Sequence, residues 1–144
     1  MFSKEEAAAL RQEFWTSFGK SFPRKWLLYN TKIKGISFKF VADRKKAMVC
    51  LDIEHSEEIS NEILYDKLLS LKAILTDEYF PDVIFDASYE LENRKIIHRI
   101  YINHTEKFSI YNKNTWRACY EFYMKTMPKF EQFFYEYEDI INCL

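Results

Sequence analysis

Two pairs of short alternating segments constrain the fold of this chain more than any other feature of its sequence. Apolar and polar residues alternate in 36–41, and a second apolar segment, 47–54, follows after the polar turn 43–46. A period of two is typical of a half-buried strand, and the short turn predicts an antiparallel hairpin. The segments 84–91 and 95–103 predict a second hairpin in the same way.

Three longer segments have the apolar spacing of amphipathic helices. The first covers 5–20 and follows a capping box that begins at Ser3, and the second runs from 56 to about 79. The third runs from 115 to about 141 and contains Pro128, which should kink or split it because proline removes a backbone donor.

The predicted order is helix, two strands, helix, two strands, helix, which defines an α+β fold. We expect an antiparallel sheet of about four strands with the helices packed mainly on one face. The length of 144 residues fits a single domain over 1–144, and no linker, repeat or low-complexity segment divides it. The chain contains only two glycines and three prolines, and this scarcity favours long regular elements over tight turns.

The N-terminus and the cysteines predict a cytoplasmic protein. The opening segment, 1–6, carries acids where a signal peptide would be basic and then apolar, and no apolar stretch approaches the roughly 20 residues of a membrane helix. Cys50, Cys119 and Cys143 are widely spaced and form no paired motif, so we interpret them as buried free thiols. No cofactor and no metal ion is expected.

The net charge of −1 hides an uneven distribution along the chain. Residues 1–46 carry a net charge of +7, residues 47–92 carry −10 and residues 93–144 carry +2. Such asymmetry marks either a basic binding face or two regions that fold against each other and neutralise one another, and we favour the second interpretation.

Basic residues interleaved with aromatic residues form the candidate binding site. Cations hold phosphates, and exposed rings stack on bases, so Phe38 and Phe40 would form a single-strand platform if they faced solvent. The favoured alternative places Phe38 and Phe40 in the core and Lys39 in water. The candidate binding residues are Lys25, Trp26, Lys39, Arg44, Lys45 and Lys46.

Carboxylates near the second predicted hairpin are the candidate enzyme site. A metal-dependent nuclease needs carboxylates for the cation and a lysine two residues after one of them. Asp82, Glu90 and Glu92 are the acids available, but Arg94 occupies the position where the lysine is needed. We therefore favour solvated acids at a hairpin end.

Histidine and cysteine show no catalytic spacing. His55, His98 and His104 are not spaced for one helix face, and no cysteine is close to any of them in the sequence. We interpret the histidines as surface or hydrogen-bonded residues and the cysteines as small core residues.

An aromatic surplus in the last predicted helix favours a homodimer. The chain has 13 Phe, 10 Tyr and 3 Trp, and this helix carries rings on more than one side. One side of a helix cannot bury them all against one sheet, so another subunit would cover some of them. The alternative is a monomer with an aromatic surface, because tyrosine tolerates exposure.

Three parts of the sequence resemble a known family. They are 13–18, the segment 36–47 with its basic turn, and the aromatic last helix with Trp116, Tyr120 and Phe130. Together they resemble the uncharacterised prokaryotic domain-of-unknown-function family 4268 (DUF4268) over nearly the whole chain. The resemblance implies an α+β domain that occurs alone or behind nuclease-like and restriction-type domains, hence a nucleic-acid context by analogy. It implies no known activity, so no site residue is carried over.

We therefore expect a binding or interaction module without catalysis, in a nucleic-acid or restriction/defence context. Its expected partners are a second copy of the chain and a nucleic acid or an unknown protein. The alternative is a metal-dependent hydrolase or nuclease, and it requires Asp82, Glu90 or Glu92 to converge on one cation. A third hypothesis, a purely structural partner, predicts a large apolar patch and no charged cleft.

Overall fold

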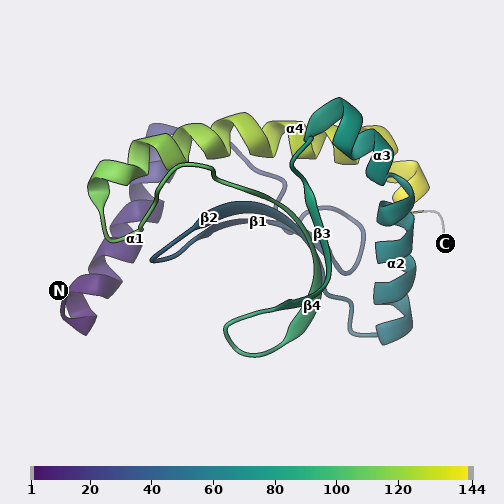
Figure 1. Ribbon diagram of the computed structural model, residues 1–144, viewed down its shortest axis with the longest axis horizontal. Helices are drawn as coiled ribbons and strands as arrows, with labels where there is room; N and C mark the ends of the chain where they lie inside the picture. The colour runs from purple at the N-terminus through teal and green to yellow at the C-terminus, as the bar shows by residue number, and fades with distance from the viewer. Residues whose placement is uncertain (1, 143–144) are drawn as a thin grey trace.

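A four-stranded antiparallel sheet organises the computed structural model, which describes residues 2–142 (Figure 1). The element order confirms the predicted α+β fold, and both predicted hairpins form. The elements are α1 (Lys4–Ser21), β1 (Ile36–Ala42), β2 (Ala47–Ile53), α2 (Glu58–Ser70), α3 (Lys72–Ile74), the π-helical turn η1 (Leu75–Tyr79), β3 (Ile84–Glu90), β4 (Ile96–Asn103), the 3-10 turn η2 (Lys113–Thr115) and α4 (Trp116–Asn142).

The two hairpins join through their second strands. The sheet order is β1–β2–β4–β3, so β2 and β4 lie at its centre. The antiparallel pairing of β2 with β4 places Asp52 directly opposite Arg99. The pairing of β3 with β4 is irregular between Asp86 and Tyr89, and such an irregularity bends the edge of a sheet.

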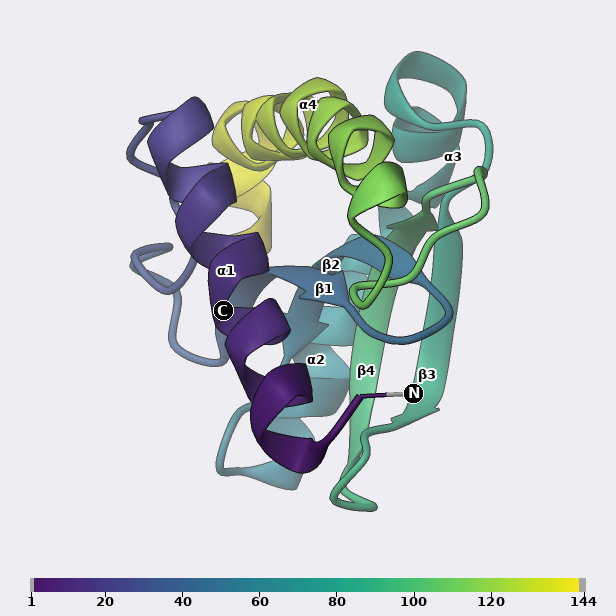
Figure 2. The same ribbon diagram turned by 90° about the vertical axis from the view of Figure 1, so that its left-hand side faces the viewer.

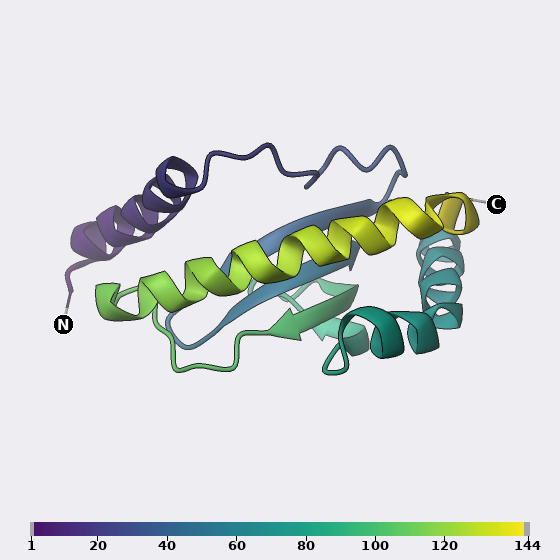
Figure 3. The same ribbon diagram turned by 90° about the horizontal axis from the view of Figure 1, so that it is seen from above.

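One face of the sheet, here called the helix-covered face, packs against α1, α2 and α4 (Figures 1 and 2). Seen from above, α4 runs along the sheet, with α1 near one end and α2 near the other (Figure 3). The ring of Phe38 is fully buried 5.3 Å from that of Phe130, and Phe40 packs on the same core, so their predicted core position is confirmed. The apolar side chains of this face include Ile36, Phe38, Phe40, Val49, Leu51, Ile53, Ile100 and Ile102.

The opposite face, here called the open face, carries no helix among residues 2–142 (Figure 1). Its side chains come from the intervening strand positions, as the period of two requires. They include Lys39, Cys50, Asp52, Arg99 and Tyr101.

The second predicted helix is broken in the structure. It was expected to continue from 56 to about 79, but α2 ends at Ser70, and Leu71 adopts φ −96 and ψ 6. The chain then continues through α3 and η1 in a new direction (Figure 1). Leu68 and Leu75, on either side of the break, are both buried. The change of direction therefore lets both segments contribute to one core.

The last helix is continuous, so the predicted split at Pro128 is wrong. α4 runs from Trp116 to Asn142 without interruption (Figure 3). A proline inside a helix costs about 3 kcal/mol. Met127 and Phe130, beside the proline, are fully buried, and each such side chain contributes roughly 1.5–3 kcal/mol. Packing therefore outweighs the lost hydrogen bond.

The aromatic residues of α4 are covered from several sides within the chain. Tyr120 packs 5.0 Å from Phe14 of α1, Phe130 packs on the sheet, and Phe133 lies 5.5 Å from Tyr79 of η1. The surplus of rings that favoured a dimer is thus largely accounted for without a partner.

None of the described helices is both long enough and apolar enough to cross a membrane.

Candidate functional site

The carboxylate of Asp43 fixes the backbone of the turn between β1 and β2. The carboxylate of Asp43 accepts hydrogen bonds from the backbone amides of Lys45 and Lys46, both at 2.8 Å. The carbonyl of Asp43 accepts from the amide of Ile110 at 3.0 Å, which fastens the turn to the segment before α4. Because the backbone is fixed in this way, the side chains of Arg44, Lys45 and Lys46 are presented from a rigid support.

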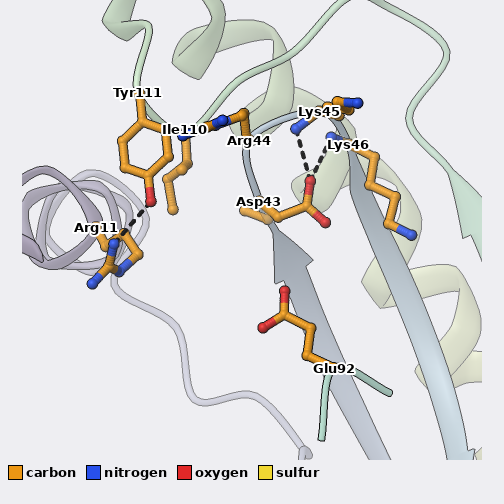
Figure 4. Close-up of a pocket in the computed structure, with 9 residues that line it drawn as sticks. Arg11, Asp43, Arg44, Lys45, Lys46, Glu92, Ile110 and Tyr111 are labelled. Carbon is orange, nitrogen blue, oxygen red and sulfur yellow. Dashed lines mark hydrogen bonds between the residues drawn. The ribbon is translucent and has the colours of Figure 1, made fainter. Parts of the chain in front are cut away.

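A cleft of about 700 Å³ lies beside this turn (Figure 4). Arg11 of α1 donates a 2.8 Å hydrogen bond to the hydroxyl of Tyr111, and the guanidinium of Arg44 lies 6.0 Å from the Tyr111 ring. Glu92, from the turn between β3 and β4, lies on the other wall (Figure 4). We call this cleft the turn cleft. Four basic and two acidic side chains line it: Arg11, Arg44, Lys45, Lys46, Asp43 and Glu92.

A second cleft of about 460 Å³ continues from the turn cleft onto the open face and shares Asp43, Lys46 and Glu92 with it. The ammonium of Lys46 donates to the hydroxyl of Tyr89 at 3.1 Å. This hydrogen bond raises the pKa of Lys46, although partial burial opposes the shift. The Tyr89 ring lies 4.4 Å from the guanidinium of Arg99, so Tyr89 covers the centre of the open face.

The centre of the open face holds a buried ion pair. Arg99 donates to both carboxylate oxygens of Asp52, at 2.7 and 2.9 Å, and both side chains are almost inaccessible to solvent. Burial disfavours the charged guanidinium, but the hydrogen bonds to Asp52 and the electrostatic attraction of Asp52 and neighbouring groups together outweigh burial and raise the pKa of Arg99. The bidentate geometry explains why an arginine can lie buried at this position.

Lys39 belongs to this network. The sequence predicted that this side chain would lie free in water, and the structure does not bear this out. Its ammonium lies 2.9 Å from the carboxylate of Glu54 and 3.2 Å from that of Asp52. Lys95 binds the other oxygen of Glu54 at 3.1 Å. Burial disfavours the charge on Lys39, but the hydrogen bond to Glu54 and the attraction of both acids leave its pKa raised. Lys39 is therefore committed to ion pairs within the chain.

The six candidate binding residues thus fall into three places. Arg44, Lys45 and Lys46 come together at the turn cleft, and Lys39 lies in the ion network of the open face. The other two, Lys25 and Trp26, lie in the connection before β1, at the opposite end of this strand from the turn. The Trp26 ring is half-buried beneath the guanidinium of Arg24, 4.5 Å away.

The candidate catalytic acids do not converge. Asp82 precedes β3, whereas Glu90 and Glu92 lie at and beyond its far end. A seven-residue strand between them corresponds to more than about 20 Å. In the part of the chain that the structure describes, no three His, Cys, Asp or Glu side chains are grouped so that they could hold a metal ion.

The histidines and cysteines lie mostly in packed surroundings. His98 stacks on Tyr65 at 4.5 Å and lines a cleft of about 410 Å³ together with His55, whereas His104 packs against a different ring. Cys50 and Cys119 are buried free thiols, as expected, and burial raises the pKa of Cys119 to about 12. A thiol with this pKa is not a nucleophile at neutral pH. Cys143 lies outside the described residues.

The candidate site contains residues that the sequence did not indicate. Arg11 and Tyr111 are 100 positions apart, and their contact depends on how α1 packs beside the segment before α4. Arg99 and Asp52 meet because β2 pairs with β4, which does not follow from either hairpin alone. The only local signal was the basic turn itself.

The comparisons with known proteins identify a family but no activity. A family described as a domain of unknown function, DUF4268, matches residues 10–138. This match covers most of the chain, so the protein belongs to the DUF4268 family, and the resemblance seen in the sequence is confirmed. Neither the curated proteins nor the solved structures contain a match to the chain.

Proposed function

We propose that this DUF4268 domain is a binding module without catalysis, whose turn cleft contacts the phosphate backbone of a nucleic acid. The convergence of Arg11 with Arg44, Lys45 and Lys46 on one cleft supports the proposal most strongly. Two acids also line the cleft, but the carboxylate of Asp43 is occupied by the turn amides. The lining therefore keeps a net positive charge, which favours an anionic ligand.

The surroundings of the cleft favour contact with phosphates over contact with bases. Phe38 and Phe40, the rings that would have formed a stacking platform, belong to the core. The hydroxyl groups of the two rings beside the cleft, Tyr111 and Tyr89, are hydrogen-bonded to Arg11 and Lys46. Binding at the turn cleft should consequently depend on salt and be largely independent of base sequence.

Fluorescence anisotropy with labelled single- and double-stranded DNA and RNA at low salt tests this function. The triple variant Arg44→Ala/Lys45→Ala/Lys46→Ala should weaken binding by about tenfold or more, because three phosphate contacts are lost. It should also reduce the slope of log affinity against log salt by roughly two to three.

The matched control removes the same charge from exposed positions on α4 that do not line the turn cleft. The control variant is Arg117→Ala/Lys125→Ala/Lys129→Ala, and it should bind nearly as the unmodified protein does. Equal losses in both triple variants would reduce the effect to net charge and refute a specific cleft. No binding by the unmodified protein to any of the four nucleic acids at low salt would refute the function itself.

Homodimerisation and a cytoplasmic location belong to the same proposal. The buried free thiols Cys50 and Cys119 favour a reducing compartment.

For a dimer, the available apolar side chains include Ile59 and Ile63, one turn apart on α2, which expose 65% and 40% of their surface. Light scattering at high concentration should give twice the mass of the chain, and Ile59→Ser/Ile63→Ser should give a monomer. A monomer from the unmodified protein would refute the dimer.

A further inference from the structure

The connection between α1 and β1 is long and irregular, and all of its charged residues are basic. Residues 22–35, here called the basic loop, contain neither helix nor strand. No Asp or Glu occurs anywhere from 14 to 42, whereas this stretch has six Lys or Arg residues. Irregular connections of such length are uncommon in small domains and are usually functional or disordered. The contacts of the basic loop decide between these two alternatives.

Hydrogen bonds from two other elements hold the basic loop in place. Glu131 of α4 is buried, and its carboxylate accepts from the amide of Leu27 and from Arg24, both at 2.8 Å. The carbonyl of Leu28 accepts from the amide of Phe38 in β1 at 3.0 Å. A buried side chain with two hydrogen bonds into the loop and a backbone bond to the sheet edge are typical of an ordered segment.

A strained turn in this loop presents Tyr29 to solvent. The amide of Asn30 donates to the carbonyl of Leu27 at 2.8 Å, and Leu28 adopts φ +43, where glycine is favoured. Leu28 itself packs against the core, and Tyr29 exposes 72% of its surface, more than any other large hydrophobic residue described. Backbone strain of this kind is retained where the surrounding contacts fix it, often at binding sites.

Exposed lysines flank this ring. Lys25, Lys32 and Lys34 are all exposed, and none of them forms an ion pair within residues 2–142. Tyr29 forms no aromatic or cation–π contact within the same residues. An accessible ring with unpaired cations on both sides of it in the sequence is a combination with which proteins hold single-stranded nucleic acid.

We propose that Tyr29 stacks on an unpaired base of a single-stranded nucleic acid while Lys25, Lys32 and Lys34 contact the flanking phosphates. The inference rests on the proposed function for its class of ligand and adds a second contact. The basic loop and the turn cleft lie at opposite ends of the seven-residue β1, about 20 Å apart along the strand. A strand of several nucleotides spans this distance. An acidic peptide would need the lysines but not the exposed ring.

Single-residue variants at Tyr29 test the stacking contact by anisotropy with labelled oligothymidylate. Tyr29→Ala should weaken binding by about tenfold, whereas Tyr29→Phe should bind within about twofold of the unmodified protein, because the ring is kept. The matched control is Tyr135→Ala, which removes a tyrosine with 59% exposure that is followed by Glu136 on α4. It should not change the affinity. Binding of duplex DNA, which offers no unpaired base, should be insensitive to Tyr29→Ala.

The outcomes separate this site from the turn cleft. Unchanged binding of oligothymidylate by Tyr29→Ala, with the Arg44→Ala/Lys45→Ala/Lys46→Ala variant still impaired, would overturn the stacking site and leave the proposed function standing. No binding of single strands by the unmodified protein, with duplexes still bound, would overturn the stacking site alone. No binding of any of the four nucleic acids would overturn both. A polyglutamate peptide that binds as tightly as oligothymidylate, with the same loss in Tyr29→Ala, would overturn it in favour of an acidic protein partner.

Discussion

The two faces of the sheet bury their side chains by different physical means. On the helix-covered face, rings from α1, α4 and β1 interlock, as in the contact of Phe38 with Phe130 at 5.3 Å. On the open face, Asp52 and Arg99 are just as inaccessible to solvent, but a bidentate ion pair occupies the space. Burial of apolar surface drives folding, whereas the desolvation of two charges consumes most of their attraction.

Strand β2 contributes to both faces, which makes the contrast sharp. All seven of its residues are buried, so burial alone cannot tell which face is the core. Leu51 packs beneath the helices, while the next residue, Asp52, bonds Arg99 on the other side. The difference teaches that one face supplies most of the stability and that the other holds charged groups in fixed positions next to the clefts.

The largest expected effect is on the helix-covered face. Phe130→Ala should lower the free energy of unfolding by about 3–5 kcal/mol, because it removes a fully buried ring and leaves a cavity. Urea denaturation followed by circular dichroism measures the change. Tyr135→Ala, on the exposed side of the same helix, should stay within about 0.5 kcal/mol of the unmodified protein. Similar losses in both variants would mean that the core does not lie beneath α4.

The buried ion pair should give the next effect. Asp52→Ala should cost about 3 kcal/mol, since it leaves the guanidinium of Arg99 buried without its partner. The double variant Asp52→Leu/Arg99→Met should recover most of this loss, because an apolar pair carries no desolvation cost. The same denaturation experiment decides. A double variant as unstable as Asp52→Ala would show that the pair itself stabilises the open face, and the contrast between the faces would fail.

The helix-covered face could largely be predicted from the sequence, because local periodicity determines it. The alternation in 36–41 placed Phe38 and Phe40 in the core correctly, and each predicted strand differs from the observed one by a single residue at one end. The break at Leu71 and the continuity through Pro128 were missed because packing between distant segments outweighs local preference there.

The open face could not be predicted in the same way, because its contacts join residues far apart in the chain. Lys39 was expected in water, yet the hairpin brings it to Glu54 and Asp52. The pairing of Asp52 with Arg99 requires the sheet order, which hairpin signals leave open. At the turn cleft, the basic turn could be seen in the sequence, but the contribution of Arg11 could not.

The smallest effect, and one specific to the open face, is a dependence of stability on pH through Glu54. Burial tends to raise the pKa of the Glu54 carboxyl, but the hydrogen bonds and the positive charges of Lys39 and Lys95 together outweigh burial, and the pKa is lowered from 4.5. A carboxyl with a lower pKa in the folded state contributes stability above about pH 4.5, and this contribution is lost as the pH falls through the folded value.

Urea denaturation between pH 7 and pH 3 should therefore show Glu54→Gln less stable than the unmodified protein at pH 7, and the difference in stability should disappear in acid. In a Lys39→Met background, which lacks one donor to Glu54, the Glu54→Gln substitution should lower the stability at pH 7 by less than it does in the unmodified protein. A difference in stability that stays constant with pH would mean that Glu54 is not held by these lysines in solution, and the charged network of the open face would then end at Asp52.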